Sequence, residues 1–441
     1  MPKLLLINPV NPAKTGLTVN KSSRFPPISL GIIAALTPPH WQIEIVDENW
    51  QTFEFQPADL VGITAFTASA PRAYELAAIY RQKGIPVVMG GIHASMCTEE
   101  ASQFVDSVVI GEAEPVWPRV IADFESSRLQ ARYLAEYKDM DGMVIPRRDL
   151  FHPGYLFSSI QTSRGCPMNC EFCSVTAFNG RRYRRRPNSE ILAELETIPQ
   201  QMLFFVDDNI IGYGDKSRQA ALELFKGMVE RKLNKLWFCQ ASINFADDEE
   251  VLRWAAKAGC KMVFLGLEAE EESALEVVNK NLNLQRGVDA YQNAFDRIHK
   301  AGIAVLGAFI FGMDGDTPAK LEKRCQYLIH SGVDVMQTTI LTPLPGTRLF
   351  NRFTQEGRLI YDQFPQDWVH YDMTEVVFSP DHMTPVELDL GMVAANKAMY
   401  STTRLFSKAI KTLFSTKNMM TTMFAWSSNQ NYRSVAGDHQ R

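Results

Sequence analysis

Three cysteines with the spacing C-x₃-C-x₂-C are the residues in this chain most suited to chemistry. Cys166, Cys170 and Cys173 lie in the stretch RGCPMNCEFC, residues 164–173. A structural zinc site or an ordinary iron–sulfur cluster takes four protein ligands. Three thiolates on a four-iron cluster would leave one iron without a protein ligand, and a substrate could bind there.

The composition narrows the choice of site and of protein class. Zinc ligands usually recur as two separated pairs, and no second pair accompanies these cysteines, so a zinc site would need a distant Cys or His. Seven Cys in total favour a reducing cytoplasm with one metal site over a disulfide framework. A net charge of −5 gives no general basic field for nucleic acid, and no apolar run is long enough to span a bilayer. We therefore expect a cytoplasmic protein.

The first 125 residues alternate between strand and helix patterns. Strands that are apolar on both faces and separated by helices indicate a doubly wound parallel sheet, whose ligand lies outside the carboxyl ends of the strands. The loops at those ends are residues 8–11, 64–70, 90–93 and 111–112. The predicted strands are residues 3–8, 42–48, 59–66, 86–91 and 107–114, and the predicted helices are residues 26–37, 71–84 and 117–125.

A polar connector, residues 126–153, precedes a second alternation with longer helices. Six strand patterns are two short of a closed eight-stranded barrel, so we expect an open partial barrel. Functional groups then come from the carboxyl ends of the strands. The predicted strands are residues 155–165, 202–209, 236–244, 262–270, 305–313 and 334–346, and the predicted helices are residues 189–198, 217–232, 248–259 and 286–302.

The sequence after Gly346 is first aromatic and irregular, then helical. Thr384, Pro385 and Glu387 form a helix start, with an N-cap, a proline at the first position and a glutamate three residues after the cap. The predicted α/β fold has four parts, which are a doubly wound Rossmann-like domain (residues 1–135), a linker (136–154), a partial (β/α)6 barrel (155–348) and a mixed, then mainly helical, C-terminal region (349–441).

The cysteine motif resembles that of radical S-adenosylmethionine (SAM) enzymes, because aromatic Phe172 precedes the last Cys and the motif follows the first barrel strand. The resemblance covers residues 155–346. It implies a [4Fe-4S] cluster on Cys166, Cys170 and Cys173, whose open iron binds the amino and carboxylate groups of SAM. One electron, supplied by a flavodoxin or ferredoxin, then cleaves SAM to methionine and a 5′-deoxyadenosyl radical that abstracts a hydrogen atom.

Other barrel positions match features of the same family. The resemblance places Asp207 and Asp208 at the SAM amino group, although either residue could instead cap the next helix. It places Gly307 in a glycine-rich strand beside the adenosine, although a strand glycine can serve packing alone. The cofactor-binding candidates of the barrel are Phe172, Asp207, Asp208, Glu268, Gly307 and Ile310.

A doubly wound domain followed by this barrel resembles the cobalamin-binding radical SAM proteins. The phrases DLVGIT, PVVMGGIHA and VVIGEAE match in order, over about 130 residues. The resemblance implies that three loops face the corrin, with glycine where a flat macrocycle lies on the backbone. The candidates are Thr64, Ala65, Phe66, Gly90, Gly91, His93, Gly111 and Glu112.

One departure from that pattern concerns the cobalt ligand. Cobalamin proteins that ligate cobalt with histidine carry D-x-H-x-x-G after the first strand, whereas this chain reads NPVNPAKTG at residues 8–16 and has no His before His40. We therefore expect no histidine ligand from this loop. His93 is either a replacement or a loop residue that only hydrogen-bonds, and the domain could also lack a cofactor.

The resemblance implies methylation of an unactivated carbon in an apolar or cyclic small molecule. One SAM would methylate the cobalamin, a second would give the radical, and the substrate radical would take the methyl group. The alternatives are a radical SAM cyclase, lyase or oxidoreductase, with or without cobalamin, and a non-catalytic metal-binding scaffold. The architecture alone does not choose between them.

Two basic segments suggest further contacts. The run RRYRRRP, residues 181–187, is by its composition a solvated surface, but its Arg side chains could also anchor a phosphate or carboxylate, or dock an acidic flavodoxin or ferredoxin. Residues 392–426 have the spacing of a basic amphipathic helix. That helix could rest on a membrane and admit a lipid-like substrate, or cap the open barrel end.

Overall fold

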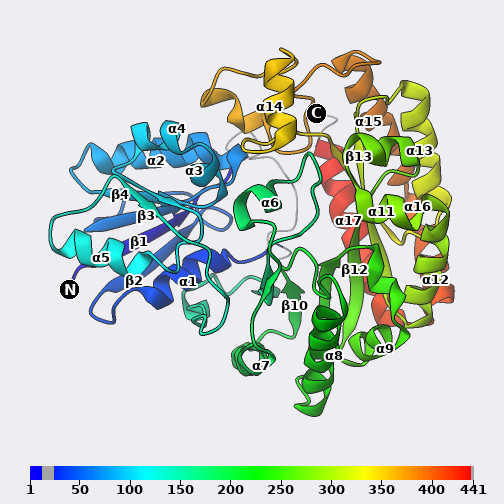
Figure 1. Cartoon of the computed structure of the whole chain (residues 1–441), viewed down its shortest axis with the longest axis horizontal. Helices are drawn as coiled ribbons and strands as arrows, with labels where there is room; N and C mark the ends of the chain where they lie inside the picture. Colours follow the sequence, from blue (N-terminus) through cyan, green and yellow to red (C-terminus); the bar gives the residue numbers. More distant parts are fainter. Residues whose placement is uncertain (12–23, 439–441) are drawn as a thin grey trace.

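The computed structural model describes residues 1–11 and 24–438, which form two parallel sheets and a helical C-terminal region. Figure 1 shows the N-terminal sheet and the barrel side by side, with α6 (Ser174–Asn179) and α14 (Arg348–Gln355) between them. Residues 12–16, the second half of the loop that departs from the cobalt-ligating pattern, lie outside the described residues.

The N-terminal sheet has six parallel strands in the order β2-β1-β3-β4-β5-β6. The order reverses between β1 and β3, which is the point where an open α/β sheet binds its ligand. The sixth strand, β6, lies within the predicted irregular connector, so that prediction was wrong there. The strands are β1 (Lys3–Asn8), β2 (Gln42–Asp47), β3 (Leu60–Thr64), β4 (Val87–Gly90), β5 (Ser107–Ile110) and β6 (Arg132–Leu134).

Both faces of this sheet are covered by helices, as a doubly wound fold requires. Alternate residues of β1 show it, because Leu4 packs with Leu30 and Trp117 on one face, whereas Leu5 packs with Tyr74 on the other. The first face belongs to α1 (Ile28–Leu36) and α5 (Trp117–Glu125), and the second to α2 (Ala70–Arg81), α3 (Ile92–Met96) and α4 (Thr98–Phe104).

The second sheet has six parallel strands in the order β14-β13-β12-β11-β10-β7, which confirms the open partial barrel. The first and last strands, β7 and β14, are its two edges. The strands are β7 (Phe157–Ile160), β10 (Met202–Phe205), β11 (Leu236–Ala241), β12 (Cys260–Glu268), β13 (Ala304–Phe311) and β14 (Val335–Ile340). The outer helices are α7 (Asn188–Thr197), α8 (Asp215–Glu230), α9 (Glu249–Lys257), α12 (Tyr291–Lys300) and α13 (Pro318–His330).

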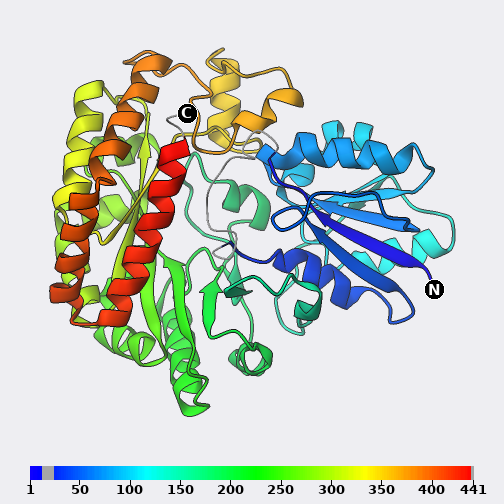
Figure 2. The same ribbon diagram turned by 180° about the vertical axis from the view of Figure 1, so that it is seen from behind.

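Residues 392–426 do not form one helix but belong to three, α15 (Pro385–Met399), α16 (Thr402–Thr416) and α17 (Met419–Asp438). The predicted start of α15 is correct, since Thr384 and Glu387 make both hydrogen bonds of a capping box. Figure 2 shows α17 lying along the barrel strands. Among the described helices, none is long and apolar enough to cross a membrane.

Helix α17 lies against the open edge strand β14 and also contacts β13 and β12. Asn429 accepts a hydrogen bond from the backbone N–H of Met336 at 3.4 Å and donates one to the carbonyl of Asp334 at 2.9 Å. The Tyr400 hydroxyl donates to the carbonyl of Met336 at 2.5 Å. These side chains satisfy the backbone groups that an edge strand leaves unpaired.

Candidate functional site

The three motif cysteines lie on one loop at the carboxyl end of β7, between β8 (Ser163–Arg164) and α6, and all are half-buried. Gly165 enters the loop with φ +87, and a Cβ there would lie 2.3 Å from the carbonyl oxygen of Arg182. Only glycine fits this position. The Sγ of Cys166 lies 3.1 Å from the hydroxyl of Tyr213, a residue for which the sequence offered no motif.

The chemistry of this loop fits a cluster better than a single ion. Within the described residues, no three His, Cys, Asp or Glu side chains are grouped closely enough to hold one metal ion. The thiolates of a four-iron cluster bind different irons, so their sulfurs stand farther apart than the ligands of one ion. Burial raises the pKa of Cys170 and raises that of Cys173 to about 12, while nearby Lys280 opposes the shift in both. A cluster held by these thiols would therefore have to displace their protons.

Glu268 and Lys280 form a buried ion pair beside the cysteine loop. Glu268 ends β12 with φ +66, and its carboxylate accepts a hydrogen bond from Lys280 Nζ at 2.6 Å. Burial disfavours the ammonium of Lys280, but Glu268 and the neighbouring Cys170 and Cys173 outweigh it and raise the Lys280 pKa. Lys280 lies in a polar stretch without a recognisable motif, which is why the sequence did not predict it.

The two aspartates after β10 have different surroundings. Asp207 is fully buried and accepts hydrogen bonds from the backbone and hydroxyl of Thr162 and from the hydroxyl of Ser163, so it holds the strand that leads into the cysteine loop. These bonds occupy the carboxylate that was expected at the SAM amino group. Asp208 is half-buried, and burial together with Asp207 raises its pKa to about 6. Asp208 is therefore the better candidate for a cationic ligand group.

The remaining barrel candidates differ in position. Gly307 lies in the middle of β13, and a Cβ there would come within 2.9 Å of Val333, so packing alone accounts for this glycine and its place beside the adenosine stays a prediction. Ile310 is buried, and its carbonyl accepts a hydrogen bond from Arg324 at 2.8 Å. Phe172 is half-buried and packs against the barrel core between two of the cysteines.

The N-terminal candidates gather at the carboxyl ends of β3, β4 and β5. Gly91 has φ +94, and a Cβ there would meet Thr64 Oγ1 at 2.7 Å, so glycine lets the loops after β3 and β4 approach. Gly111 also has a left-handed φ, +85, whereas a side chain at Gly90 would make only ordinary contacts. Between Thr64 and the helix that follows, Ala65 is buried and the side chain of Phe66 is 76% exposed.

His93 is enclosed by residues of its own domain and by Trp368 of the C-terminal region. Its Nε2 lies 3.0 Å from the hydroxyl of Tyr74 and 3.2 Å from Glu100, and its ring meets Trp368 edge-on. Nδ1 is buried without a hydrogen-bond partner among the described residues. Of the two expectations for His93, the structure supports the residue that hydrogen-bonds within the loop.

The carboxylate of Glu112 joins the two domains through ion pairs, and its predicted position facing the corrin stays a prediction. Its carboxylate pairs with Arg164 Nη1 at 2.9 Å and with Arg184, on the two short strands β8 and β9 (Arg184–Arg185) that flank the cysteine loop. Burial alone would raise the pKa of Glu112, but the two guanidinium groups outweigh it and lower that pKa.

The arginine run is only partly a solvated surface. Arg181 and Arg182 are exposed, as that interpretation requires. Arg184 and Arg186 are buried and pair with Glu112 and Glu194, so the interpretation was wrong for them. The pattern of charges did not predict these pairs, because Glu112 is 72 residues from Arg184 and Glu194 lies on the next helix, α7.

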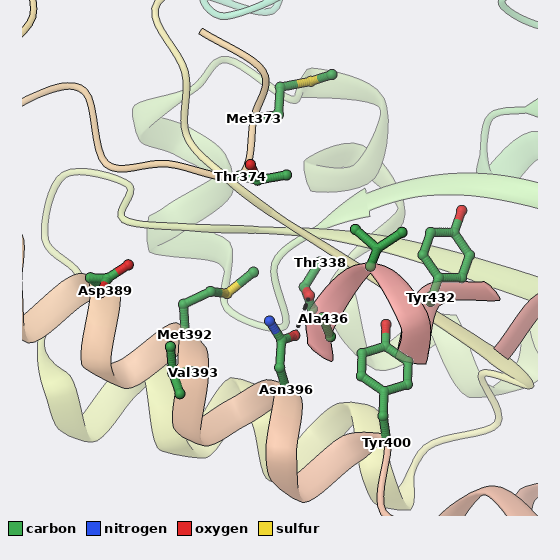
Figure 3. A pocket seen from close by; sticks show the side chains of 11 residues that line it. Thr338, Met373, Thr374, Asp389, Met392, Val393, Asn396, Tyr400, Tyr432 and Ala436 are labelled. Carbon is green, nitrogen blue, oxygen red and sulfur yellow. Dashed lines mark hydrogen bonds between the residues drawn. The ribbon is translucent and has the colours of Figure 1, made fainter. Parts of the chain in front are cut away.

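A pocket opens beside the edge strand β14, between α15 and α17 (Figure 3). Thr338 donates a hydrogen bond to Asn396 across it at 3.2 Å. None of the predicted site residues lines this pocket. Its lining residues are Thr338, Met373, Thr374, Asp389, Met392, Val393, Asn396, Tyr400, Tyr432, Val435 and Ala436.

Comparisons with known proteins agree with this arrangement. Residues 160–328 match the radical SAM superfamily, and residues 17–121 match the B12 binding domain. The bacteriochlorophyllide d C-8(2)-methyltransferase of Chlorobaculum tepidum is 28% identical over 417 residues, 89% of each chain. The hopanoid C-2 methylase of Rhodopseudomonas palustris is 30% identical over 355 residues, covering 76% of this chain and 66% of that enzyme.

Solved structures share the fold. The cobalamin-dependent SAM radical enzyme OxsB, with aqua-cobalamin bound, has a TM-score of 0.70 at 14% identity, and the match covers 100% of this chain and 80% of OxsB. Fold, cysteine loop and sequence matches together define a radical SAM enzyme with a B12 binding domain. The chain belongs to the cobalamin-binding radical SAM family, whose cofactors are a [4Fe-4S] cluster, SAM and cobalamin. This membership excludes the non-catalytic scaffold that the sequence had left open.

Proposed function

We propose that this enzyme transfers a methyl group to an unactivated carbon of a bulky, largely apolar cyclic molecule. Two relatives support both the reaction and the substrate class, since one is named for bacteriochlorophyllide and the other for a hopanoid. The cluster, SAM and cobalamin supply the radical chemistry and the methyl group when bound.

The observation that carries the proposal is that the site loops of the two domains adjoin. α3, which follows β4, contacts α6, which follows the cysteine loop. Glu112 at the end of β5 binds the arginines on either side of that loop. Methyl transfer from one cofactor domain to a substrate radical in the other requires this proximity, because the reacting atoms must come into contact.

We assign the SAM-binding role to Asp208, Glu268 and Lys280. Asp208 offers a half-buried carboxylate to the SAM ammonium, and the Lys280 ammonium, close to Cys170 and Cys173, offers a charge to the SAM carboxylate. Glu268 holds Lys280 in place. Charged hydrogen bonds in a partly buried site fix orientation as well as affinity.

We assign the corrin surface to the loop after β3. Phe66 is a large aromatic side chain left exposed at the point where the strand order reverses, and a flat macrocycle over it would remove apolar surface from water. Because His93 is enclosed by Tyr74, Glu100 and Trp368, it does not ligate cobalt in this assignment.

We assign the docking site of the electron donor to the exposed side of the cysteine loop. Arg181 donates to the carbonyl of Pro167 at 3.2 Å, and Arg348 donates to that of Asn169 at 2.5 Å. Both guanidinium groups are exposed, and neither forms an ion pair with any residue that the structure describes. An acidic flavodoxin or ferredoxin complements this charge at the shortest distance from the cluster.

Anaerobic reconstitution with iron, sulfide and cobalamin tests the proposal. We expect about four irons per chain and a corrin absorption band. With a bacteriochlorophyllide or hopene probe we expect 5′-deoxyadenosine and S-adenosylhomocysteine to form together. Cys170→Ala should abolish both products, whereas Cys97→Ala, a half-buried thiol outside the loop, should not. 5′-Deoxyadenosine with a cyclised product and no S-adenosylhomocysteine would contradict methyl transfer.

A further inference from the structure

The hairpin of α16 and α17 exposes an unusual number of large apolar side chains. Phe406, Ile410 and Phe414 are spaced four residues apart and therefore lie along one side of α16, with Phe406 61% and Phe414 76% exposed. Three exposed methionines follow at the start of α17. We call these six the hairpin apolar surface, which consists of Phe406, Ile410, Phe414, Met419, Met420 and Met423.

The buried side of α16 is mostly polar, since Lys408, Thr412 and Thr416 are buried there together with Leu405. Lys408 is buried and donates hydrogen bonds to the carbonyls of Leu328 and Val333 at the end of α13. Thr412 donates to Asp334 at 2.6 Å. An ordinary surface helix buries its apolar stripe and exposes its polar one. Three of the four buried side chains of α16 are polar, so burial within this chain does not account for the exposed apolar stripe.

The charged side chains of the segment that carries the hairpin apolar surface all have one sign. Residues 390–437 contain no Asp or Glu. Arg404, Lys411 and Lys417 are exposed beside the apolar side chains. A second copy of the chain docking here would bring like charges together, which is unfavourable. A surface that is apolar inside and anionic outside is complementary to both features.

We propose that the hairpin apolar surface docks this enzyme on an anionic lipid membrane. Phe406, Ile410 and Phe414 would enter the boundary between head groups and acyl chains, and Arg404 and Lys417 would contact the lipid phosphates. Methionine adapts well to such an irregular apolar surface. The inference rests on the proposed apolar substrate, because it names the phase in which the enzyme meets that substrate.

Flotation of the reconstituted holoenzyme with lipid vesicles tests this proposal. We expect binding to phosphatidylcholine vesicles that contain phosphatidylglycerol, weak binding to pure phosphatidylcholine, and release at high salt. Phe406→Ser with Phe414→Ser should lower vesicle affinity at least about tenfold. Arg404→Glu with Lys417→Glu should remove the preference for anionic lipid. Leu134→Ser, an equally exposed apolar residue on β6, is the matched control and should bind like the unmodified enzyme.

Three outcomes would overturn membrane docking. The first is that the unmodified enzyme binds no vesicles, and the second is that the serine pair binds them as well as the unmodified enzyme does. The third outcome is a dimer in lipid-free buffer that the serine pair dissociates, since a second copy would then be the partner. Formation of 5′-deoxyadenosine without vesicles is the independent readout, and both the serine pair and the unmodified enzyme should form it. If the unmodified enzyme forms none, the proposed function is refuted, while the vesicle-binding result still stands.

Discussion

Asp207 and Asp208 are neighbours in the chain, yet the structure gives them different chemistry. The carboxylate of Asp207 receives hydrogen bonds from Thr162 and Ser163, so it stabilises the strand before the cysteine loop. The carboxylate of Asp208 has its pKa raised to about 6, chiefly by burial. At the residue scale, a buried carboxylate that lowers the stability of the ligand-free protein is a candidate for binding a cationic ligand.

Replacing Asp208 with Asn should stabilise the cofactor-free protein and weaken SAM binding. Because the pKa of Asp208 is higher in the folded protein than in the unfolded chain, the ionised carboxylate lowers the free energy of unfolding. This loss of stability is fully present above about pH 6 and disappears as the pH falls toward the pKa of the unfolded chain. We expect a higher melting temperature for Asp208→Asn at pH 7 to 8 and a shrinking difference toward pH 4. SAM affinity should fall by about tenfold or more in calorimetry.

The matched control for this change is Asp215→Asn. Asp215 begins α8, is 93% exposed and pairs with Arg218 at the surface. It should alter the melting temperature little at any pH. An Asp208→Asn protein that is less stable than the unmodified protein at pH 7, with unchanged SAM affinity, would refute this assignment.

Lys280→Met should separate the two proposed roles of this lysine, which are the ion pair with Glu268 and the binding of the SAM carboxylate. Removing the ammonium leaves Glu268 buried without its partner, and unfolding free energy should drop by about 3 kcal/mol or more. The double variant Lys280→Met with Glu268→Leu should recover much of that stability without recovering SAM affinity, measured by thermal unfolding and calorimetry. Recovery of SAM affinity in the double variant would mean that Lys280 has only a structural role.

At the element scale, α14 fixes the cysteine loop from the C-terminal side of the barrel. The backbone N–H of Leu349 donates to the carbonyl of Glu171 at 3.2 Å, and Arg352 bonds the Glu171 carboxylate at 2.9 Å. Arg352 also pairs with Asp314 after β13 at 2.7 Å. The cysteine loop is therefore positioned by an element about 180 residues away in sequence.

The exposed arginines beside that loop give a prediction about electron transfer. Arg181→Glu with Arg348→Glu should slow cluster reduction by reduced flavodoxin or ferredoxin at low salt by about tenfold or more, because the docking charge is reversed. Reduction by dithionite should stay unchanged, since it needs no docking. Stopped-flow bleaching of the cluster band measures both rates. Equal slowing with dithionite would show that the loop itself was disturbed and would contradict donor docking there.

At the scale of the whole molecule, a few buried ion pairs hold the two domains in register. Glu112 of the N-terminal domain is bound by Arg164 and Arg184 of the barrel. Trp368, from the segment after the barrel, donates to Glu100 of the N-terminal domain at 3.0 Å. Because the site loops belong to different domains, these contacts set the distance between the two cofactor sites.

Glu112→Gln should destabilise the chain far more than a comparable surface change. Two buried guanidinium groups would lose their shared counter-charge, at a cost of about 3–5 kcal/mol. Glu99→Gln removes an exposed carboxylate that pairs with Arg132, and should cost less than about 1 kcal/mol. Chemical denaturation of both variants compares the two. Equal, small effects would mean that Glu112 does not join the domains.

The sequence by itself determined the features that depend on local spacing and periodicity. The cysteine triplet, the parallel α/β order of both sheets and the capping box at Thr384 follow from residues close together in the chain. Tertiary structure alone decided which charges meet. It brought Lys280 to Glu268, matched Glu112 to the arginine run, separated Asp207 from Asp208 in function, and placed Gly307 in the core. The physical reason is that local patterns encode elements, whereas the pairing of buried charges depends on distances that only packing sets.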